Sequence, residues 1–181
     1  MTKNDFKNNF RCETILKLQK ESNKINTIVK DKKISDHIYR LIKKHDFKTI
    51  MIYIPLKSEV NINALTLKLR QEGKMILVPF MEGKSFRLVQ YRLPLNKKKF
   101  GIKEPKNSHK FIKKNIDLAV VPIVGTDRTL RRVGFGKGMY DRFFEKEKKY
   151  INYTLFVTRK LFISKHYITD NHDISADMIL A

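Results

Sequence analysis

The residues best suited to chemistry lie between positions 120 and 144. Glycines alternate at Gly134, Gly136 and Gly138, with Lys137 between the last two. Alternating glycines leave backbone N–H groups free to converge on an anion, and the start of a following helix adds a favourable dipole. The pattern therefore predicts either a structural strand-to-helix turn or a phosphate-binding loop.

Clustered positive charge around the loop favours the phosphate alternative. Four arginines accompany it: Arg128, Arg131, Arg132 and Arg142. Like charges held together cost stability unless an anion compensates them. Two common phosphate loops do not match, because Met139 replaces the third glycine of a dinucleotide fingerprint and Gly138 replaces the Ser or Thr of a Walker loop. Asp141 could hold magnesium on bound phosphates, or could interact only with the helix dipole.

The elements on either side of the loop would position it. Residues 116–121 are apolar except for Asp117 and end at Pro122, which predicts a buried strand. Residues 137–148 place Tyr140, Phe143 and Phe144 at helical spacing and predict an amphipathic helix. The loop would then lie at the carboxyl end of a strand.

The run from Asp127 to Asp141 resembles the signature of the 5-formyltetrahydrofolate cyclo-ligases, Arg-x-Gly-aromatic-Gly-x-Gly-x-Tyr-Asp. Met139 stands where that family usually has a second tyrosine lining the folate pocket. The resemblance implies catalytic roles for Arg132 and Lys137. It also implies ATP binding by a continuous stretch: Arg132, Val133, Gly134, Phe135, Gly136, Lys137, Gly138, Met139 and Tyr140.

Residues 4–22 form the first predicted helix, since Phe6, Phe10, Ile15 and Leu18 recur at roughly helical spacing. Lys7 and Arg11 lie four residues apart and so share one helix face. Taken alone, they would be two solvated cations. The family has a Lys-x-x-x-Arg pair on its first helix, and the resemblance implies ATP binding by Lys7, Asn8, Asn9, Phe10 and Arg11, with Arg11 also reaching the substrate.

The substrate side of the predicted site follows another apolar strand, residues 49–54, which ends at Pro55. A carboxylate such as Glu59 can accept paired hydrogen bonds from an aminopyrimidine edge, although it could instead be a carboxylate near the start of a helix. The family's Ser-Glu-Val-like turn matches here, and its Gly-x-x-Glu-Pro segment matches residues 101–105. The resemblance implies folate contacts from Arg11, Ile54, Glu59, Phe100, Phe135 and Met139.

The closing segment, residues 168–177, resembles the family's His-Asp segment. The resemblance implies that Asp173 joins Asp141 at magnesium, a hard cation that prefers oxygen ligands. His172 is predicted to be a polar turn residue, because magnesium does not favour nitrogen. The implied reaction is the ATP- and Mg²⁺-dependent cyclisation of 5-formyltetrahydrofolate to 5,10-methenyltetrahydrofolate, with release of ADP and phosphate through a phosphorylated formyl intermediate.

Composition bounds the remaining possibilities. The 181 residues carry 39 Lys+Arg against 18 Asp+Glu, a net charge of +21. Polyanions are the expected partners, but the lysines are scattered and no nucleic-acid-binding motif accompanies them. ATP and a folate carrying several glutamates are anions too, and lysines of residues 96–114 could attract that glutamate tail. A non-catalytic folate-binding relative and, less favoured, a basic nucleic-acid-binding α/β protein remain as alternatives.

Helices alternate with apolar strands along the chain, with further helices predicted at 35–44 and 63–71 and strands at 75–79, 86–91 and 150–157. This order predicts one domain over 1–181: a Rossmann-like three-layer α/β sandwich with a mostly parallel sheet and helices on both faces. The sequence contains no run of about 18 apolar residues, so it predicts no membrane-spanning helix. The single Cys12 and the absence of an apolar leader lead us to expect a cytoplasmic protein, and we expect a monomer without nucleic-acid or membrane partners.

Overall fold

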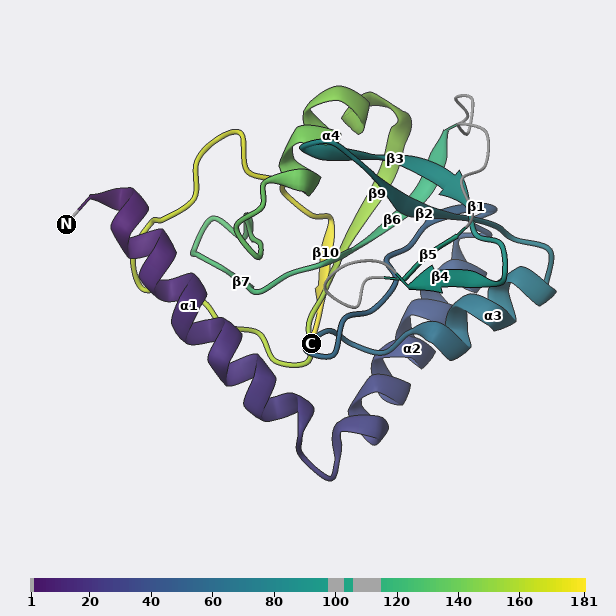
Figure 1. Cartoon of the computed structure of the whole chain (residues 1–181), viewed down its shortest axis with the longest axis horizontal. Coiled ribbons are helices and arrows are strands. Elements are labelled where there is room, and N and C mark those ends of the chain that lie inside the picture. Colours follow the sequence, from purple (N-terminus) through teal and green to yellow (C-terminus); the bar gives the residue numbers. More distant parts are fainter. Residues whose placement is uncertain (1, 98–102, 106–114) are drawn as a thin grey trace.

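The computed structural model describes residues 2–97, 103–105 and 115–181, and a six-stranded sheet lies at its centre (Figure 1). Its strand order is β10-β9-β6-β1-β2-β3. The strands are β1 (Thr49–Met51), β2 (Met75–Glu82), β3 (Ser85–Gln90), β6 (Ile116–Pro122), β9 (Ile151–Val157) and β10 (Met178–Leu180). All neighbours run parallel except β2 and β3, which form an antiparallel hairpin through Gly83 at φ +58°. The predicted mostly parallel α/β sheet is confirmed.

Helices cover both faces of the sheet, as expected for parallel strands joined by crossovers. On one face, α2 (Thr27–Lys44) and α3 (Asn63–Gln71) bury Ile38, Ile42 and Leu69 against Ile50 of β1. On the other face, α4 (Met139–Glu147) buries two phenylalanines against Met51 of the same strand. The alternation of neighbouring strand residues between the two cores gives the three-layer arrangement.

Helix α2 begins eight residues earlier than the predicted start at Ser35. Ser35 and Asp36 lie inside the helix, so they do not cap it. The first turns are fixed by tertiary contacts instead: Asp31 is buried and accepts a hydrogen bond from the Asn61 amide at 3.0 Å. Such contacts are not visible in local sequence preference.

Other boundaries also differ from the predictions. β1 ends at Met51, although the Ile52 amide still donates to the Leu77 carbonyl at 2.8 Å. Helix α4 begins at Met139 rather than at 137, because Gly136 and Gly138 have positive φ angles that a helix excludes. The sequence patterns also missed β10 and two small hairpins. Those hairpins pair β4 (Leu95–Lys97) with β5 (Lys103–Pro105) and β7 (Gly125–Thr126) with β8 (Arg132–Val133).

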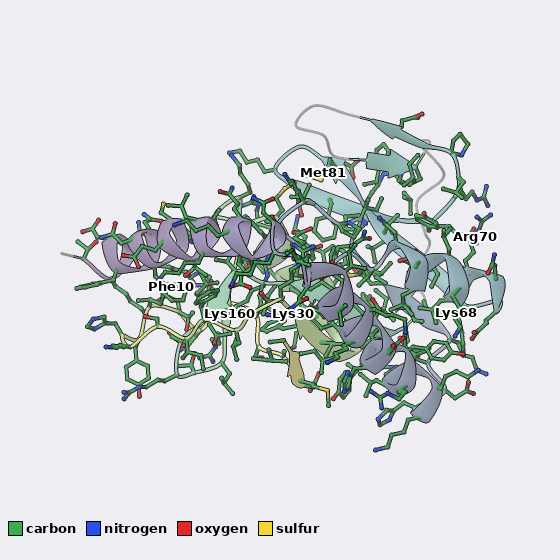
Figure 2. The ribbon with its side chains drawn as sticks, turned by 90° about the horizontal axis from the view of Figure 1, so that it is seen from below. Phe10, Lys30, Lys68, Arg70, Met81 and Lys160 are labelled. Carbon is green, nitrogen blue, oxygen red and sulfur yellow. The ribbon has the colours of Figure 1, made fainter. Side chains whose placement is uncertain are left out.

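The first helix, α1 (Lys3–Ser22), lies at one side of the molecule and runs beside the C-terminal segment (Figure 1). A capping box between Thr2 and Asp5 begins it. Phe10 projects from α1 toward the body of the protein (Figure 2), where a Cβ built on Gly125 would lie 2.9 Å from its ring. Within the described ranges, no helix combines the length and the apolarity that a membrane crossing requires.

Candidate functional site

The glycine loop joins β8 to α4 at the carboxyl end of the sheet. Gly136 has φ +90° and Gly138, the N-cap of α4, has φ +61° in the left-handed region. Side chains with a Cβ are disfavoured at such angles, so this backbone path depends on glycine. The loop thereby presents its backbone at the beginning of a nine-residue helix, where anions are favoured.

An apolar pocket of about 200 Å³ lies on one side of the loop. We call it the apolar pocket. Its lining includes Ile54, Glu59, Met81, Phe135, Met139 and Tyr140. Phe86 of β3 also lines the pocket and stacks on Phe143 of α4, which connects the pocket wall to the core. A partly open apolar pocket with one carboxylate suits a flat, partly polar ring.

Glu59 is the acidic residue of this pocket. Burial raises the pKa of Glu59 to about 7, against opposing effects of the hydrogen bond from the Leu56 amide and of Arg132 and Arg159. The Leu56 amide donates to Glu59 Oε2 at 2.8 Å. Glu59 is therefore poised to change its protonation state near neutral pH.

Arg132 is buried in the wall of the apolar pocket, beside Gly134 of the loop, with 5% of its side chain exposed. Its Nε donates to the Pro122 carbonyl at 3.1 Å, and its guanidinium lies 4.7 Å from the centre of the Tyr140 ring. Burial lowers the pKa of Arg132, while Asp141, Tyr140 and Glu59 oppose that shift. A fixed, weakly solvated cation stabilises negative charge better than one in water.

A second, more polar pocket of about 540 Å³ lies on the other side of the loop, and we call it the glycine-loop pocket. Its lining includes Lys7, Arg11, Gly136, Asp141, His172 and Asp173. Gly138 lines both pockets, so the two spaces adjoin at the loop. A ligand in one pocket could therefore meet a ligand in the other.

Two cations of α1 reach this pocket. Arg11 Nε donates to the Gly134 carbonyl at 2.9 Å, and the Arg11 guanidinium also donates to Asn8. Lys7 Nζ lies 2.6 Å from Asp173 Oδ2, in a pair of which 13% and 6% of the side chains are exposed. The predicted Lys-x-x-x-Arg face is thus directed at the glycine loop and at the C-terminal segment.

Asp141 and Asp173 both line the glycine-loop pocket, but their surroundings differ. Asp141 Oδ1 is buried and accepts no hydrogen bond from the described part of the chain. Arg132 Nη1 lies 3.8 Å from this oxygen. Such an unsatisfied acceptor fits a magnesium ligand. Asp173 Oδ2 already accepts hydrogen bonds from Lys7 Nζ and from the Asp170 amide. Asp173 also lies close to Asp170 and His172, and the potential metal-ligand atoms of these three residues are within 4.8 Å of one another.

Asp127 holds the C-terminal segment in place at Ile168 and Thr169. The side chain is fully buried, and its two oxygens accept hydrogen bonds from backbone and hydroxyl groups of Thr129 and Thr169 and from the Ile168 amide, at 2.6–2.8 Å. Burial alone would raise the pKa of Asp127, but these hydrogen bonds outweigh it and lower the pKa to about 2. Asp127 therefore has a structural role, because its hydrogen bonds fix the backbone at Ile168 and Thr169.

The remaining predicted residues occupy varied places. Phe10 packs against Gly125, Asn9 is exposed, and Val133 is buried in β8, where its carbonyl accepts from the Val124 amide at 2.9 Å. None of these three lines either pocket as described. Phe100 lies outside the described residues.

Sequence reasoning missed the contributions of β2 and β3 to the apolar pocket. Met81, labelled in Figure 2, and Phe86 line it together with Pro79. Local patterns marked these residues only as members of alternating strands. The hairpin through Gly83 pairs β2 with β3, and β3 contacts α4, which a longer-range pairing argument could have found.

The comparisons with known proteins point in one direction. The sequence model of the 5-formyltetrahydrofolate cyclo-ligase family matches residues 3–181. A 5-formyltetrahydrofolate cyclo-ligase of Haemophilus influenzae is 29% identical over 119 residues, which cover 62% of this chain and 64% of that protein. Its counterpart in Mus musculus is 24% identical over 147 residues, 74% of this chain and 72% of that protein. The match to the bacterial relative thus spans just under two thirds of its length.

Two solved structures share the fold. The 5,10-methenyltetrahydrofolate synthetase of Aquifex aeolicus superposes with a TM-score of 0.74 at 25% identity, covering 96% of this chain and 88% of that one. The 5,10-methenyltetrahydrofolate synthetase of Mycoplasma pneumoniae superposes with a TM-score of 0.67 at 22% identity, covering 96% of both chains. The second likeness supports the fold alone.

Proposed function

This chain belongs to the 5-formyltetrahydrofolate cyclo-ligase family, and from that membership we propose that it converts 5-formyltetrahydrofolate and ATP into 5,10-methenyltetrahydrofolate, ADP and phosphate. The observation that carries the proposal is the meeting of two unlike pockets at Gly138. One is apolar with a single carboxylate, Glu59. The other is lined by the glycine loop, three cations (Lys7, Arg11 and Arg142) and three carboxylates (Asp141, Glu145 and Asp173). A folate ring and a nucleotide phosphate could therefore lie next to each other.

The apolar pocket is assigned to the folate. Ile54, Phe135 and Met139 would pack on the pterin, and the Glu59 carboxylate would accept hydrogen bonds from its aminopyrimidine edge. The unbranched Met139 side chain adapts to a flat ring without requiring a fixed orientation. Arg11 would reach the substrate only from the neighbouring glycine-loop pocket.

The glycine-loop pocket is assigned to the ATP phosphates. The backbone of the loop, Lys7 and Arg11 would bind the phosphates there. Lys137 and Arg132 line the apolar pocket at its border with the loop. Their charges would therefore face the γ-phosphoryl group during its transfer from ATP to the formyl oxygen. Their proposed role is neutralisation of charge rather than proton transfer.

The chemistry consists of two substitutions. The formyl oxygen attacks the γ-phosphorus, the bond from that phosphorus to the β-bridging oxygen breaks, and ADP leaves. The N10 amine then attacks the activated formyl carbon, loses its proton, and phosphate leaves with the former formyl oxygen. Alignment and charge stabilisation supply most of what such a phosphoryl transfer needs.

The donors in the glycine-loop pocket fit a magnesium ion on the phosphates. Asp141, with its unsatisfied buried oxygen, is the proposed ligand, and Asp173 would join it once Lys7 turns from the carboxylate to a phosphate. Bound magnesium would neutralise phosphate charge. The chain's own contribution is to hold Asp141 at the first turn of α4, beside Arg132.

The decisive experiment mixes the purified protein with 5-formyltetrahydrofolate, ATP and Mg²⁺ and follows the near-ultraviolet absorbance of the methenyl product. We expect product only when all three are present. Arg132→Ala should lower kcat by roughly 100-fold or more, as expected for a lost transition-state charge contact. Arg128→Ala, outside both pockets, is the matched control.

Two outcomes would contradict the proposal. If the protein binds 5-formyltetrahydrofolate without forming product, it is a folate-sequestering relative rather than an enzyme. If it neither binds nor converts the folate but shows steeply salt-dependent RNA or DNA affinity, the positive charge reports its function instead. Full turnover by the Arg132→Ala variant would remove Arg132 from its proposed role.

A further inference from the structure

A buried ion pair outside both pockets holds the segment that carries Glu59. Arg159, just after β9, donates from Nε to Asp31 Oδ1 at 2.8 Å and from Nη2 to Asp31 Oδ2 at 2.9 Å. The residue exposures are 7% for Arg159 and 6% for Asp31. The pair thus joins α2 to the segment that follows β9, the second strand of the sheet, through a two-point contact that fixes orientation as well as distance.

The same two side chains hold both ends of the segment 57–61, which contains Glu59. Arg159 Nη1 donates to the Lys57 carbonyl at 2.9 Å, and Asp31 Oδ2 accepts from the Asn61 amide at 3.0 Å. Between these two points, the Tyr53 hydroxyl donates to the Val60 carbonyl at 2.9 Å. The backbone from 57 to 61 is therefore fastened on each side of Glu59.

A buried ion pair is a costly way to gain stability, because desolvation offsets most of the attraction. An apolar pair of similar size would hold α2 on the sheet equally well. It would not satisfy the Lys57 carbonyl and the Asn61 amide, and it would not place a positive charge near Glu59. The polar contacts therefore indicate a requirement for geometry.

We propose that Arg159 and Asp31 are positioning residues that hold residues 57–61 so that the Glu59 carboxylate faces the apolar pocket. This inference rests on the proposed function for its kinetic consequence, because it assigns Glu59 to the folate. Its structural part, the fastening of residues 57–61, stands independently. Neither Arg159 nor Asp31 lines the apolar pocket as described, so neither is a catalytic residue.

The electrostatics support the same assignment. The charge of Arg159, together with that of Arg132, opposes the burial that raises the pKa of Glu59. The other titratable groups facing Glu59 are Tyr53 and Tyr140, whose own pKa values are raised by burial and by Glu59, and Lys137 shares the pocket lining. Loss of Arg159 removes one of two cations that favour the ionised carboxylate.

The test uses the double variant Asp31→Leu/Arg159→Met, which replaces the pair by apolar side chains and avoids leaving one buried charge unpaired. We expect the KM for 5-formyltetrahydrofolate to rise about tenfold while the KM for ATP stays within twofold. The pH at which folate affinity is half-maximal should also move upward. The conservative Arg159→Lys variant, which retains the charge, should show a smaller upward shift than the double variant.

Ile42→Ala is the control for general destabilisation, since Ile42 is fully buried on α2 and lines neither pocket as described. It should lower the melting temperature without changing the ratio of the two KM values. Amide hydrogen exchange provides the readout that does not depend on activity. Exchange of residues 56–61 should rise at least tenfold in the double variant and stay unchanged in Ile42→Ala.

The outcomes separate the two proposals. Unchanged exchange at 56–61, or an equal rise of both KM values, overturns the positioning role. If the wild-type protein forms no product and binds no folate, the proposed function fails. In that case increased exchange in the double variant still confirms that the pair holds residues 57–61, and the link to folate is withdrawn.

Discussion

Two carboxylates, Glu59 and Asp127, lie in buried surroundings that shift their pKa values in opposite directions. Glu59 has few donors, so burial dominates and raises its pKa to about 7. Asp127 receives several hydrogen bonds, which outweigh burial and lower its pKa to about 2. Donors to the charged form decide the direction of the shift, and they also indicate which carboxylate is available to a ligand.

Glu59→Gln should raise the KM for 5-formyltetrahydrofolate roughly 10- to 100-fold, as for the loss of a hydrogen bond to a charged group. Because only the ionised form of Glu59 accepts the proposed pair of hydrogen bonds, wild-type affinity should increase as pH rises through about 7 and fall below it. The variant should lose this inflection in a pH profile of KM. Glu13→Gln, on the exposed side of α1, is the control. An inflection that survives in Glu59→Gln would assign the titration to another group.

Asp127→Asn should destabilise the protein by about 2 kcal/mol at pH 7, because it removes hydrogen bonds to a buried charge. The folded-state pKa is below the usual 3.8, so the stabilisation is present above about pH 4 and is lost as pH falls toward 2. Urea unfolding at several pH values should show the wild-type and variant curves converging in acid. Asp36→Asn, on the exposed face of α2, should change stability by less than about 0.5 kcal/mol. A constant gap between wild type and Asp127→Asn at all pH values would contradict this account.

Among the elements, the glycine loop and α4 were predicted well, whereas α2 and the small hairpins were not. The glycine loop could be predicted from local sequence, because alternating glycines between a strand and a helix are typical of a turn with exposed backbone N–H groups. The start of α2 depends on Asp31 meeting Arg159 and the Asn61 amide, residues that are distant in sequence. The same reason explains why the pocket walls from β2 and β3 were missed: local patterns predict elements, but contacts between elements require the fold.

Gly138→Ala tests the backbone requirement of the loop. A Cβ at φ +61° should cost about 1 kcal/mol, and it would also meet the Arg142 guanidinium, whose flexible end can move away. We expect a raised KM for ATP together with a lower melting temperature. Gly138→Asn should be the milder change, since asparagine tolerates left-handed angles better than alanine does. Equal effects of both variants would indicate that side-chain volume, rather than backbone conformation, is limiting.

At the scale of the whole molecule, the fold does not account for the net charge of +21. Positive potential favours anionic ligands in general. We expect each added glutamate on the folate tail to increase affinity at low salt, with the gain disappearing at about 0.5 M salt because of screening. Isothermal titration with mono- and polyglutamylated folate measures this.

Replacement of Lys97, Lys98 and Lys99 by glutamine should reduce the gain from added glutamates. A matched triple variant removes the exposed Lys17, Lys20 and Lys33 from α1 and α2 and should retain the gain. If both triple variants lose it equally, the effect comes from total charge and not from the lysine-rich segment.

The ion pair between Lys7 and Asp173 joins positions 166 residues apart. A ribosome adding roughly 5–20 residues per second would release the first helix about ten to thirty seconds before the carboxylate that it must meet. During that interval the nascent chain lacks part of the glycine-loop pocket, because Lys7 of α1 has no Asp173 to pair with. The proposed nucleotide binding at this pocket should therefore begin only after His172 and Asp173 have been synthesised and have reached α1.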